Sequence, residues 1–234
     1  MGVSGISTWQ TIMDGFDFSY LLSILLGVLP SLLCITLHEL SHGLVAYKLG
    51  DPTAKLAGRL TLNPIKHLDP MGLLMMLVFH VGWAKPVPVN MNRFQNPKRG
   101  MALTALAGPA SNLLIAALFL FLYGIFYIPL NRNGAGRYFL QMIELTAVIS
   151  IGLAVFNLLP IPPLDGSKIL FSFLSDENYR RLMRYERYVS LLLFALVWTG
   201  VFRRPLSTVM DWVYDALFPL AEGGFSLGKT LFYR

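Results

Sequence analysis

Three stretches of this chain are apolar for long enough to cross a lipid bilayer, and they restrict the fold more than any other feature. They cover residues 19–45, 101–129 and 140–160. A helix needs roughly 20 mainly apolar residues to span the hydrocarbon core, where every backbone polar group must be satisfied internally. A fourth stretch, residues 188–202, is short and needs extension towards Met183 or past Arg203. We therefore predict an all-α, multi-pass membrane protein with about four to six transmembrane helices.

The composition agrees with a membrane environment. Only 14% of the 234 residues are charged, against about 25% in soluble domains, and the mean hydropathy is +0.57. The length suits one core domain. We place this core at residues 19–204, between an N-terminal segment, 1–18, and an amphipathic or membrane-associated C-terminal segment, 205–234.

The positive charge is concentrated on one predicted side of the membrane. Thirteen of the nineteen Lys and Arg residues lie in segments 48–70, 85–100 and 165–187, which share a side if the N-terminus is outside. This distribution argues against nucleic-acid binding despite the net charge of +6. By the positive-inside rule, the basic side faces the cytoplasm and the protein lies in the cell membrane.

A short apolar segment follows the first span and leads into a proline-rich one. Residues 71–84 are too few to cross as a helix, so we predict a re-entrant hairpin. In the next segment, K-P-V-P-V-N, alternating prolines forbid a helix but permit an edge strand. Such a strand keeps the N–H donors of Val87 and Val89 on one edge and can bind an unwound substrate. The alternative is that Pro86 and Pro88 merely end the hairpin. The predicted substrate-binding residues are Lys85, Pro86, Val87, Pro88, Val89 and Asn90.

The first span contains the sequence H-E-L-S-H. On a helix, His38 and His42 share one face and can bind one zinc ion, while Glu39 lies about 100° around the helix and suits a general base. Three ionisable side chains in an apolar helix are costly without polar partners. We therefore interpret the motif as a metal site.

A catalytic zinc usually has a third protein ligand. Residues with a suitable side chain are Asp165, His80, Asp69, Glu144 and His67. Asp165 is on the same predicted side as His42, beside a helix end that Pro160, Pro162 and Pro163 must open, whereas Glu144 starts the third span at the opposite face. Non-helical backbone at this depth indicates a polar pocket.

Four motifs occur in matching order: H-E-L-S-H-G, G-W-A-K-P-V-P-V-N, A-G-P-A-S-N and N-L-L-P-I-P-P-L-D-G. In these motifs the chain resembles the site-2 protease family of intramembrane zinc metalloproteases, in particular its short prokaryotic members without a PDZ domain. The resemblance covers roughly residues 20–200. It implies that His38, His42 and Asp165 bind zinc, that Glu39 is the general base, and that Asn157 holds the scissile carbonyl or its oxyanion.

The expected function is regulated intramembrane proteolysis, with one Zn²⁺ per chain. The expected substrates are membrane proteins cut in or near their transmembrane segments. A catalytically silent zinc-binding scaffold remains as an alternative, although it has no reason to keep Glu39. A metal transporter is disfavoured, because transport requires ionisable residues at matched depth on several helices.

Three further polar residues have structural interpretations. Cys34 is on the same helix face as His38, where a cysteine mostly serves packing. His80 is either a ligand that gates the site or a partner of backbone groups in the hairpin. Asn112 is expected to make a hydrogen bond between helices.

Overall fold

The computed structural model describes residues 18–79 and 82–232, and this part of the chain is built from helices. The predicted all-α fold is confirmed. The helices are α2 (Phe18–Lys48), α3 (Thr53–Leu56), η1 (Pro64–His67), α4 (Pro70–Phe79), η2 (Met91–Arg93), α5 (Pro97–Leu130), α6 (Gly134–Asn157), α7 (Asp165–Phe171), α8 (Asp176–Trp198), α9 (Arg203–Leu217) and α10 (Pro219–Phe232).

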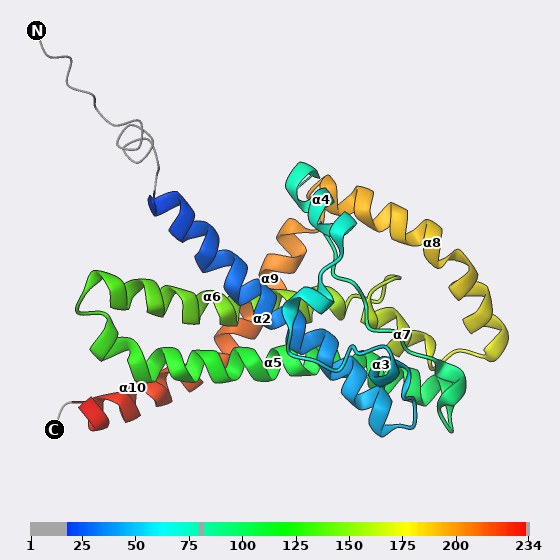
Figure 1. Ribbon diagram of the computed structural model, residues 1–234, viewed down its shortest axis with the longest axis horizontal. Helices are drawn as coiled ribbons and strands as arrows, with labels where there is room; N and C mark the ends of the chain where they lie inside the picture. The colour runs from blue at the N-terminus through cyan, green and yellow to red at the C-terminus, as the bar shows by residue number, and fades with distance from the viewer. Residues whose placement is uncertain (1–17, 80–81, 233–234) are drawn as a thin grey trace, which may run out of the picture.

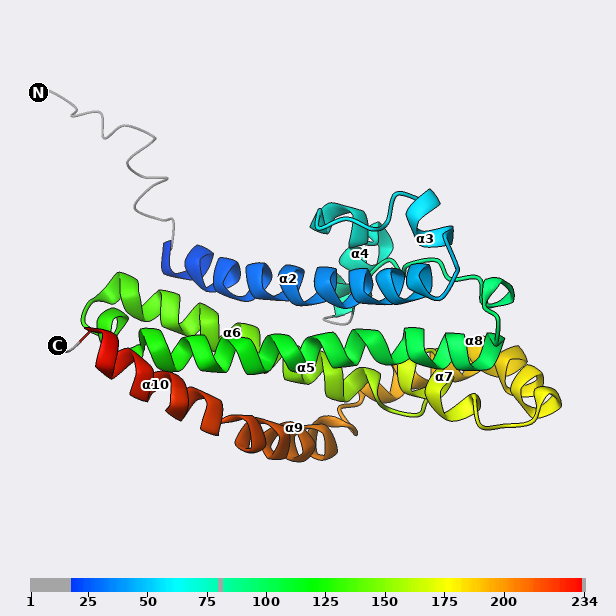
Figure 2. The same ribbon diagram turned by 90° about the horizontal axis from the view of Figure 1, so that it is seen from below.

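The bundle is organised around α5, which contacts α2, α6, α7 and α10. In Figure 2, α5 and α6 form a middle layer, with α2 on one side and α9 and α10 on the other. Helices α5 and α6 lie side by side, joined by a short turn at one end of the molecule (Figure 1). The C-terminal end of α2, the start of α5 and α7 gather at the opposite end.

Three helical segments within the described residues are long and apolar enough to cross a membrane. They are Leu26–Lys48, Pro97–Leu130 and Gly134–Asn157, in agreement with the three long spans predicted. The short fourth stretch meets this criterion only when Arg184–Trp198 and Arg203–Phe232, which are bent by 85°, are counted as one broken span. The physical reason is length, because 15 helical residues rise about 22 Å and the hydrocarbon core is about 30 Å thick.

Gly50 lies just after the end of α2. Its φ of 104° is in the left-handed region that favours glycine. The N–H of Gly50 donates to the Tyr47 carbonyl, and that of Asp51 donates to the Ala46 carbonyl. These two bonds form a Schellman motif, so the chain turns sharply after Lys48 and returns along the flank of α2.

The segment predicted as a hairpin contains helix α4, and its two ends lie side by side. Leu68 and Ala84 form an isolated antiparallel bridge, and Lys85 N–H donates to the His67 carbonyl at 2.9 Å. His80 lies outside the described residues. The described residues from 82 to 90 form no strand. The predicted edge strand therefore has no backbone pairing with another strand beyond this bridge.

The C-terminal segment packs against the bundle. Helix α9 contacts α6, and α10 lies along α5. Apolar side chains of α9, including Leu206 and Met210, pack against the buried Ile151 of α6. The boundary predicted at residue 204 stays a prediction.

Helix α6 ends at Asn157, before the first of the three prolines, as predicted. The chain then makes a short turn, and α7 begins at Asp165. A Cβ atom at Gly166 would lie 2.2 Å from the Leu158 carbonyl oxygen. Glycine after Asp165 therefore allows α7 to start directly against the end of α6.

Candidate metal centre

The two histidines of α2 converge on one point. Their Nε2 atoms are 3.0 Å apart, as expected for residues four positions apart on one helix face. Both side chains are buried, with His38 6% and His42 8% exposed. Two buried imidazoles with adjacent ring nitrogens are a typical pair of zinc ligands.

Asp165 completes a set of three donors. Its Oδ2 atom is 3.2 Å from Nε2 of His38 and 3.1 Å from Nε2 of His42, and the residue is 6% exposed. In a tetrahedral zinc site with bonds of about 2.0–2.1 Å, neighbouring ligand atoms lie about 3.3 Å apart. The three donor atoms therefore match one face of such a tetrahedron, and the residues present fit zinc.

Two of the other possible third ligands have different partners. His67 Nε2 is 2.9 Å from the Thr61 carbonyl oxygen, and Asp69 Oδ1 accepts the N–H of Gly72 at 2.9 Å. Within the described residues, the group of metal-ligand side chains that converges is His38, His42 and Asp165.

Helix α5 forms the back of the site through Gly108. A Cβ atom there would lie 2.5 Å from Cε1 and from Nε2 of His42, and 2.6 Å from Cε1 of His38. Glycine is therefore the residue that lets α5 approach both imidazoles. Gly108 belongs to the A-G-P-A-S-N motif, and the sequence alone did not indicate that this motif packs on the metal site.

Two more groups of α5 contact the imidazoles. The Thr104 carbonyl oxygen is 2.7 Å from Nδ1 of His42, and the Asn112 amide is 3.1 Å from Nδ1 of His38. Thr104, Gly108 and Asn112 are four residues apart and so share one helix face. That spacing is the signal that could have identified them. The predicted helix–helix hydrogen bond of Asn112 is confirmed, with a metal-site histidine as its partner.

Cys34 is buried one turn before His38, and its Sγ is 3.5 Å from the Thr146 carbonyl oxygen of α6. This contact between helices agrees with the packing role expected for the thiol. The second oxygen of Asp165, Oδ1, is 3.6 Å from Nζ of Lys168, so a positive charge lies on the outer side of the carboxylate.

Glu39 is next to the donors along the chain but is held by the proline-rich segment. Its Oε2 atom accepts the N–H of Val87 at 2.8 Å. The sequence places Val87 on the open edge of the substrate strand, yet in the structure its N–H is bonded to this glutamate. The proposed base and the proposed substrate segment are thus directly connected.

The same segment is anchored at its end by Asp51. This carboxylate is buried, and it accepts the N–H of Thr53 at 3.0 Å and the N–H of Asn90 at 2.6 Å. Burial favours the neutral acid, but the hydrogen bonds from Thr53 and Asn90 and the charge of Arg93 together hold the pKa of Asp51 below its ordinary value. Asp51 thus holds the turn after α2 through Thr53 and also anchors the end of the proline-rich segment through Asn90.

Asn157 does not contact the three donors through any hydrogen bond in the described part of the chain. Its Nδ2 donates to the Leu153 carbonyl of its own helix at 2.9 Å. The role that the resemblance implies for Asn157 stays a prediction.

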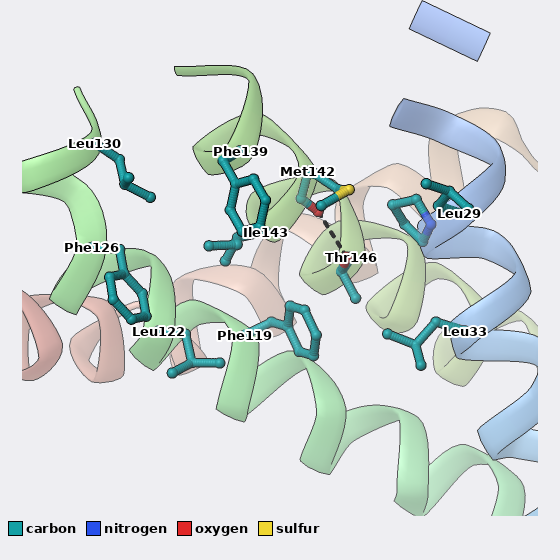
Figure 3. Close-up of a pocket in the computed structure, with 11 residues that line it drawn as sticks. Leu29, Leu33, Phe119, Leu122, Phe126, Leu130, Phe139, Met142, Ile143 and Thr146 are labelled. Carbon is teal, nitrogen blue, oxygen red and sulfur yellow. Dashed lines mark hydrogen bonds between the residues drawn. The ribbon is translucent and has the colours of Figure 1, made fainter. Parts of the chain in front are cut away.

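A cavity of about 620 Å³ lies away from the donors, between α2, α5 and α6. Figure 3 shows its lining, in which apolar side chains such as Leu33, Phe119 and Ile143 surround Thr146. The Thr146 hydroxyl donates to the Met142 carbonyl. None of the described residues that line this cavity is titratable, so we place the chemistry at the three metal donors.

Fold and site together define the class of protein. One of the apolar helices long enough to cross a membrane carries the buried His38 and His42 with Glu39 beside them, and the short helix α7 brings Asp165 to the two histidines. This combination is that of an intramembrane zinc metalloprotease.

Known sequences identify the family. The model of peptidase family M50 matches residues 124–200. The protein named "Putative zinc metalloprotease YwhC" from Bacillus subtilis is 39% identical over 206 residues, which cover 86% of this chain and 90% of that protein. "Putative zinc metalloprotease Rip2" from Mycolicibacterium smegmatis is 32% identical over 216 residues, covering 90% of this chain and 81% of the relative. No solved structure matches the chain. The chain belongs to peptidase family M50, and the predicted membership of the site-2 protease family is confirmed.

Proposed function

We propose that this protein is an endopeptidase that hydrolyses peptide bonds in or near the transmembrane segments of membrane-protein substrates. The observation that carries the proposal is the convergence of His38, His42 and Asp165, with donor atoms 3.0–3.2 Å apart, next to a glutamate that is not a ligand. His38, His42 and Asp165 would hold the zinc. Zinc bound there supplies a Lewis acid that polarises the scissile carbonyl and lowers the pKa of a water molecule towards about 7.

Glu39 acts as the general base. A carboxylate has two oxygens, and the hydrogen bond from Val87 N–H uses Oε2. This bond orients the carboxylate and leaves Oε1 as the atom that accepts a proton from the attacking water. Glu39 then passes the proton to the leaving amine.

Asn157 holds the scissile carbonyl or the oxyanion. Its amide donates to the Leu153 carbonyl of the preceding helical turn, at the point where α6 ends. The Leu153 carbonyl is part of the backbone hydrogen-bonding pattern of α6 and does not depend on the Asn157 amide. A rotation of the Asn157 side chain can therefore turn its N–H towards a substrate oxygen.

The segment from Lys85 to Asn90 receives the unwound substrate by backbone pairing. Three of its N–H groups already have acceptors. Lys85 donates to the His67 carbonyl, Val87 to Glu39 and Asn90 to Asp51. A substrate strand pairs with the remaining backbone groups of the segment, while the N–H of Val87 stays on Glu39 Oε2 and keeps the base oriented next to the incoming peptide. Recognition depends on how easily a helix unwinds, because an unpaired backbone group in a membrane costs several kcal/mol.

The site opens towards the cytoplasm. The end of the bundle that holds α3, α7 and the start of α5 (Figure 1) carries the three basic segments, whereas Arg132 and Arg137 lie at the α5–α6 turn. The positive-inside rule assigns the more basic end to the cytoplasm.

The experiment is cleavage of a panel of single-span membrane proteins by the purified protein, with Glu39→Gln as control and metal analysis of both. We expect about one zinc per chain in each protein, and a fall in turnover of about 10²–10⁴-fold in Glu39→Gln, because the amide cannot accept a proton. A variant that keeps more than a few per cent of wild-type turnover would show that another base acts. Zinc without cleavage of any panel member would favour the silent scaffold.

A further inference from the structure

Zinc binding through Nε2 sets the position of the remaining ring proton on each histidine. A neutral imidazole has one N–H and one lone pair, so a histidine that gives its Nε2 lone pair to a metal carries its proton on Nδ1. That N–H needs an acceptor in a buried site. The acceptor also fixes the ring orientation.

The acceptor for His42 is a backbone group. Its Nδ1 is 2.7 Å from the Thr104 carbonyl oxygen, which can only accept. The tautomer of His42 is therefore determined by the backbone of α5.

His38 has a different partner, the side-chain amide of Asn112. In the structure Nδ2 of Asn112 donates to Nδ1 of His38 at 3.1 Å, which suits the tautomer with its proton on Nε2. Asn112 is 0% exposed. Within the part of the chain that the structure describes, its Oδ1 is buried without a hydrogen-bond partner.

Rotation of the amide by about 180° exchanges its oxygen and nitrogen with little change in shape. The rotation brings Oδ1 to Nδ1 of His38 and gives the unpartnered oxygen an N–H to accept. The backbone of Asn112 need not move. Its carbonyl accepts the Ser150 hydroxyl at 2.8 Å, which ties this turn of α5 to α6.

We propose that Asn112 is a positioning residue for the metal site, and that its Oδ1 accepts the Nδ1 proton of His38 when His38 binds zinc through Nε2. This inference rests on the metal site of the proposed function. An amide suits the position because it carries a donor and an acceptor, so it can pair with either tautomer of His38.

The first test measures zinc affinity by chelator competition in purified, monodisperse protein. Asn112→Leu keeps a similar volume and removes the acceptor, so we expect its zinc affinity to fall by about 10–100-fold, as is typical for loss of an outer-shell partner. Asn112→Asp keeps an acceptor and should bind zinc at least as tightly as the wild type.

Ser150→Ala is the matched control, because it removes a buried hydroxyl bonded to the backbone of the same residue and touches neither imidazole. Its zinc affinity should stay at the wild-type level. Equal affinities in the wild type, Asn112→Leu and Asn112→Asp would overturn the proposal, as would equal losses in Asn112→Leu and Ser150→Ala.

A second readout needs no variant and so does not depend on how Asn112→Leu folds. In zinc-loaded wild-type protein with ¹⁵N-labelled histidine, the His38 signals should show a proton on Nδ1 that is protected from solvent exchange. A proton on Nε2, or a rapidly exchanging one on Nδ1, would contradict the assignment of Asn112. Wild-type protein that binds no zinc would instead overturn the proposed function itself, so the two failures are distinguishable.

Discussion

The metal donors are side chains of α2 and α7, whereas the Lys85–Asn90 segment lies against α2, and the two regions are held in place by different means. The donors sit on helices that pack on α5, and Gly108 contacts both imidazole rings. The segment has no strand partner in the described residues and depends on single hydrogen bonds, such as those of Val87 to Glu39 and of Asn90 to Asp51.

This difference has consequences for function. Helix packing is dense, and one added methyl group can displace its neighbours, which suits donor atoms that must keep their spacing. A segment held by individual hydrogen bonds can exchange them one at a time. That property suits a part of the protein that must admit a substrate next to a fixed metal site.

The largest effect should come from adding one methyl group behind the imidazoles. In Gly108→Ala, the new Cβ would lie 2.5 Å from Nε2 of His42, and neither the ring nor α5 can yield without moving a donor. We expect the zinc affinity to fall by more than the roughly 100-fold typical of losing one outer-shell partner. Metal analysis and chelator competition measure it.

Gly27→Ala is the matched control, because it is also a helical glycine and its Cβ would meet nothing within 4 Å. It should retain wild-type zinc. Wild-type zinc affinity in Gly108→Ala would mean that the donors are not held by packing, and the contrast between the two regions would fail.

A smaller effect, on turnover alone, is expected from Val87→Pro. Proline removes the N–H that Glu39 accepts, so the base loses its orientation. We expect cleavage to fall by about 10²-fold, the cost of a 1 Å misplacement, with normal zinc content. Val87→Thr, which keeps the N–H and the branched shape, should be mild.

Val89→Pro sharpens this test. It removes the other donor on the predicted edge but not the bond to Glu39. A loss of turnover in both proline variants supports pairing with substrate, and a loss in Val87→Pro alone assigns the N–H of Val87 to orienting Glu39. A folded Val87→Pro that cleaves at the wild-type rate would exclude both roles.

The smallest effect should be on stability, through Asp51→Asn. In the wild type the Asp51 carboxylate accepts two backbone N–H groups and lies 3.9 Å from Arg93. The variant keeps one acceptor oxygen but loses the negative charge. We expect a loss of about 1–3 kcal/mol at neutral pH. The readout is Tm in detergent as a function of pH.

The pH dependence follows from the lowered pKa of Asp51. Its contribution to stability is complete above the unfolded-state value of about 3.9 and is lost as the pH falls through the lower folded-state pKa. The difference in Tm between wild type and Asp51→Asn should therefore be constant near neutral pH and shrink in acid below about pH 4. A difference in Tm that grows in acid would contradict a lowered pKa of Asp51 in the folded protein.

Local features of the sequence determine several parts of this protein. The length of the apolar stretches predicts the three long helices, because the bilayer sets that length. Gly50 favours the end of α2, because glycine adopts the left-handed backbone conformation that this position requires without the help of distant residues. The pairing of His38 with His42 follows from the repeat of a single helix.

Only the tertiary structure decides which distant groups meet these residues. Asp165 reaches the histidines because α6 ends before its prolines and α7 starts against it. The contact of Asn112 with His38 and that of Val87 with Glu39 join residues 74 and 48 positions apart. No local periodicity encodes such pairs, because they depend on how whole helices dock and on which polar groups remain to be satisfied once the apolar faces have packed.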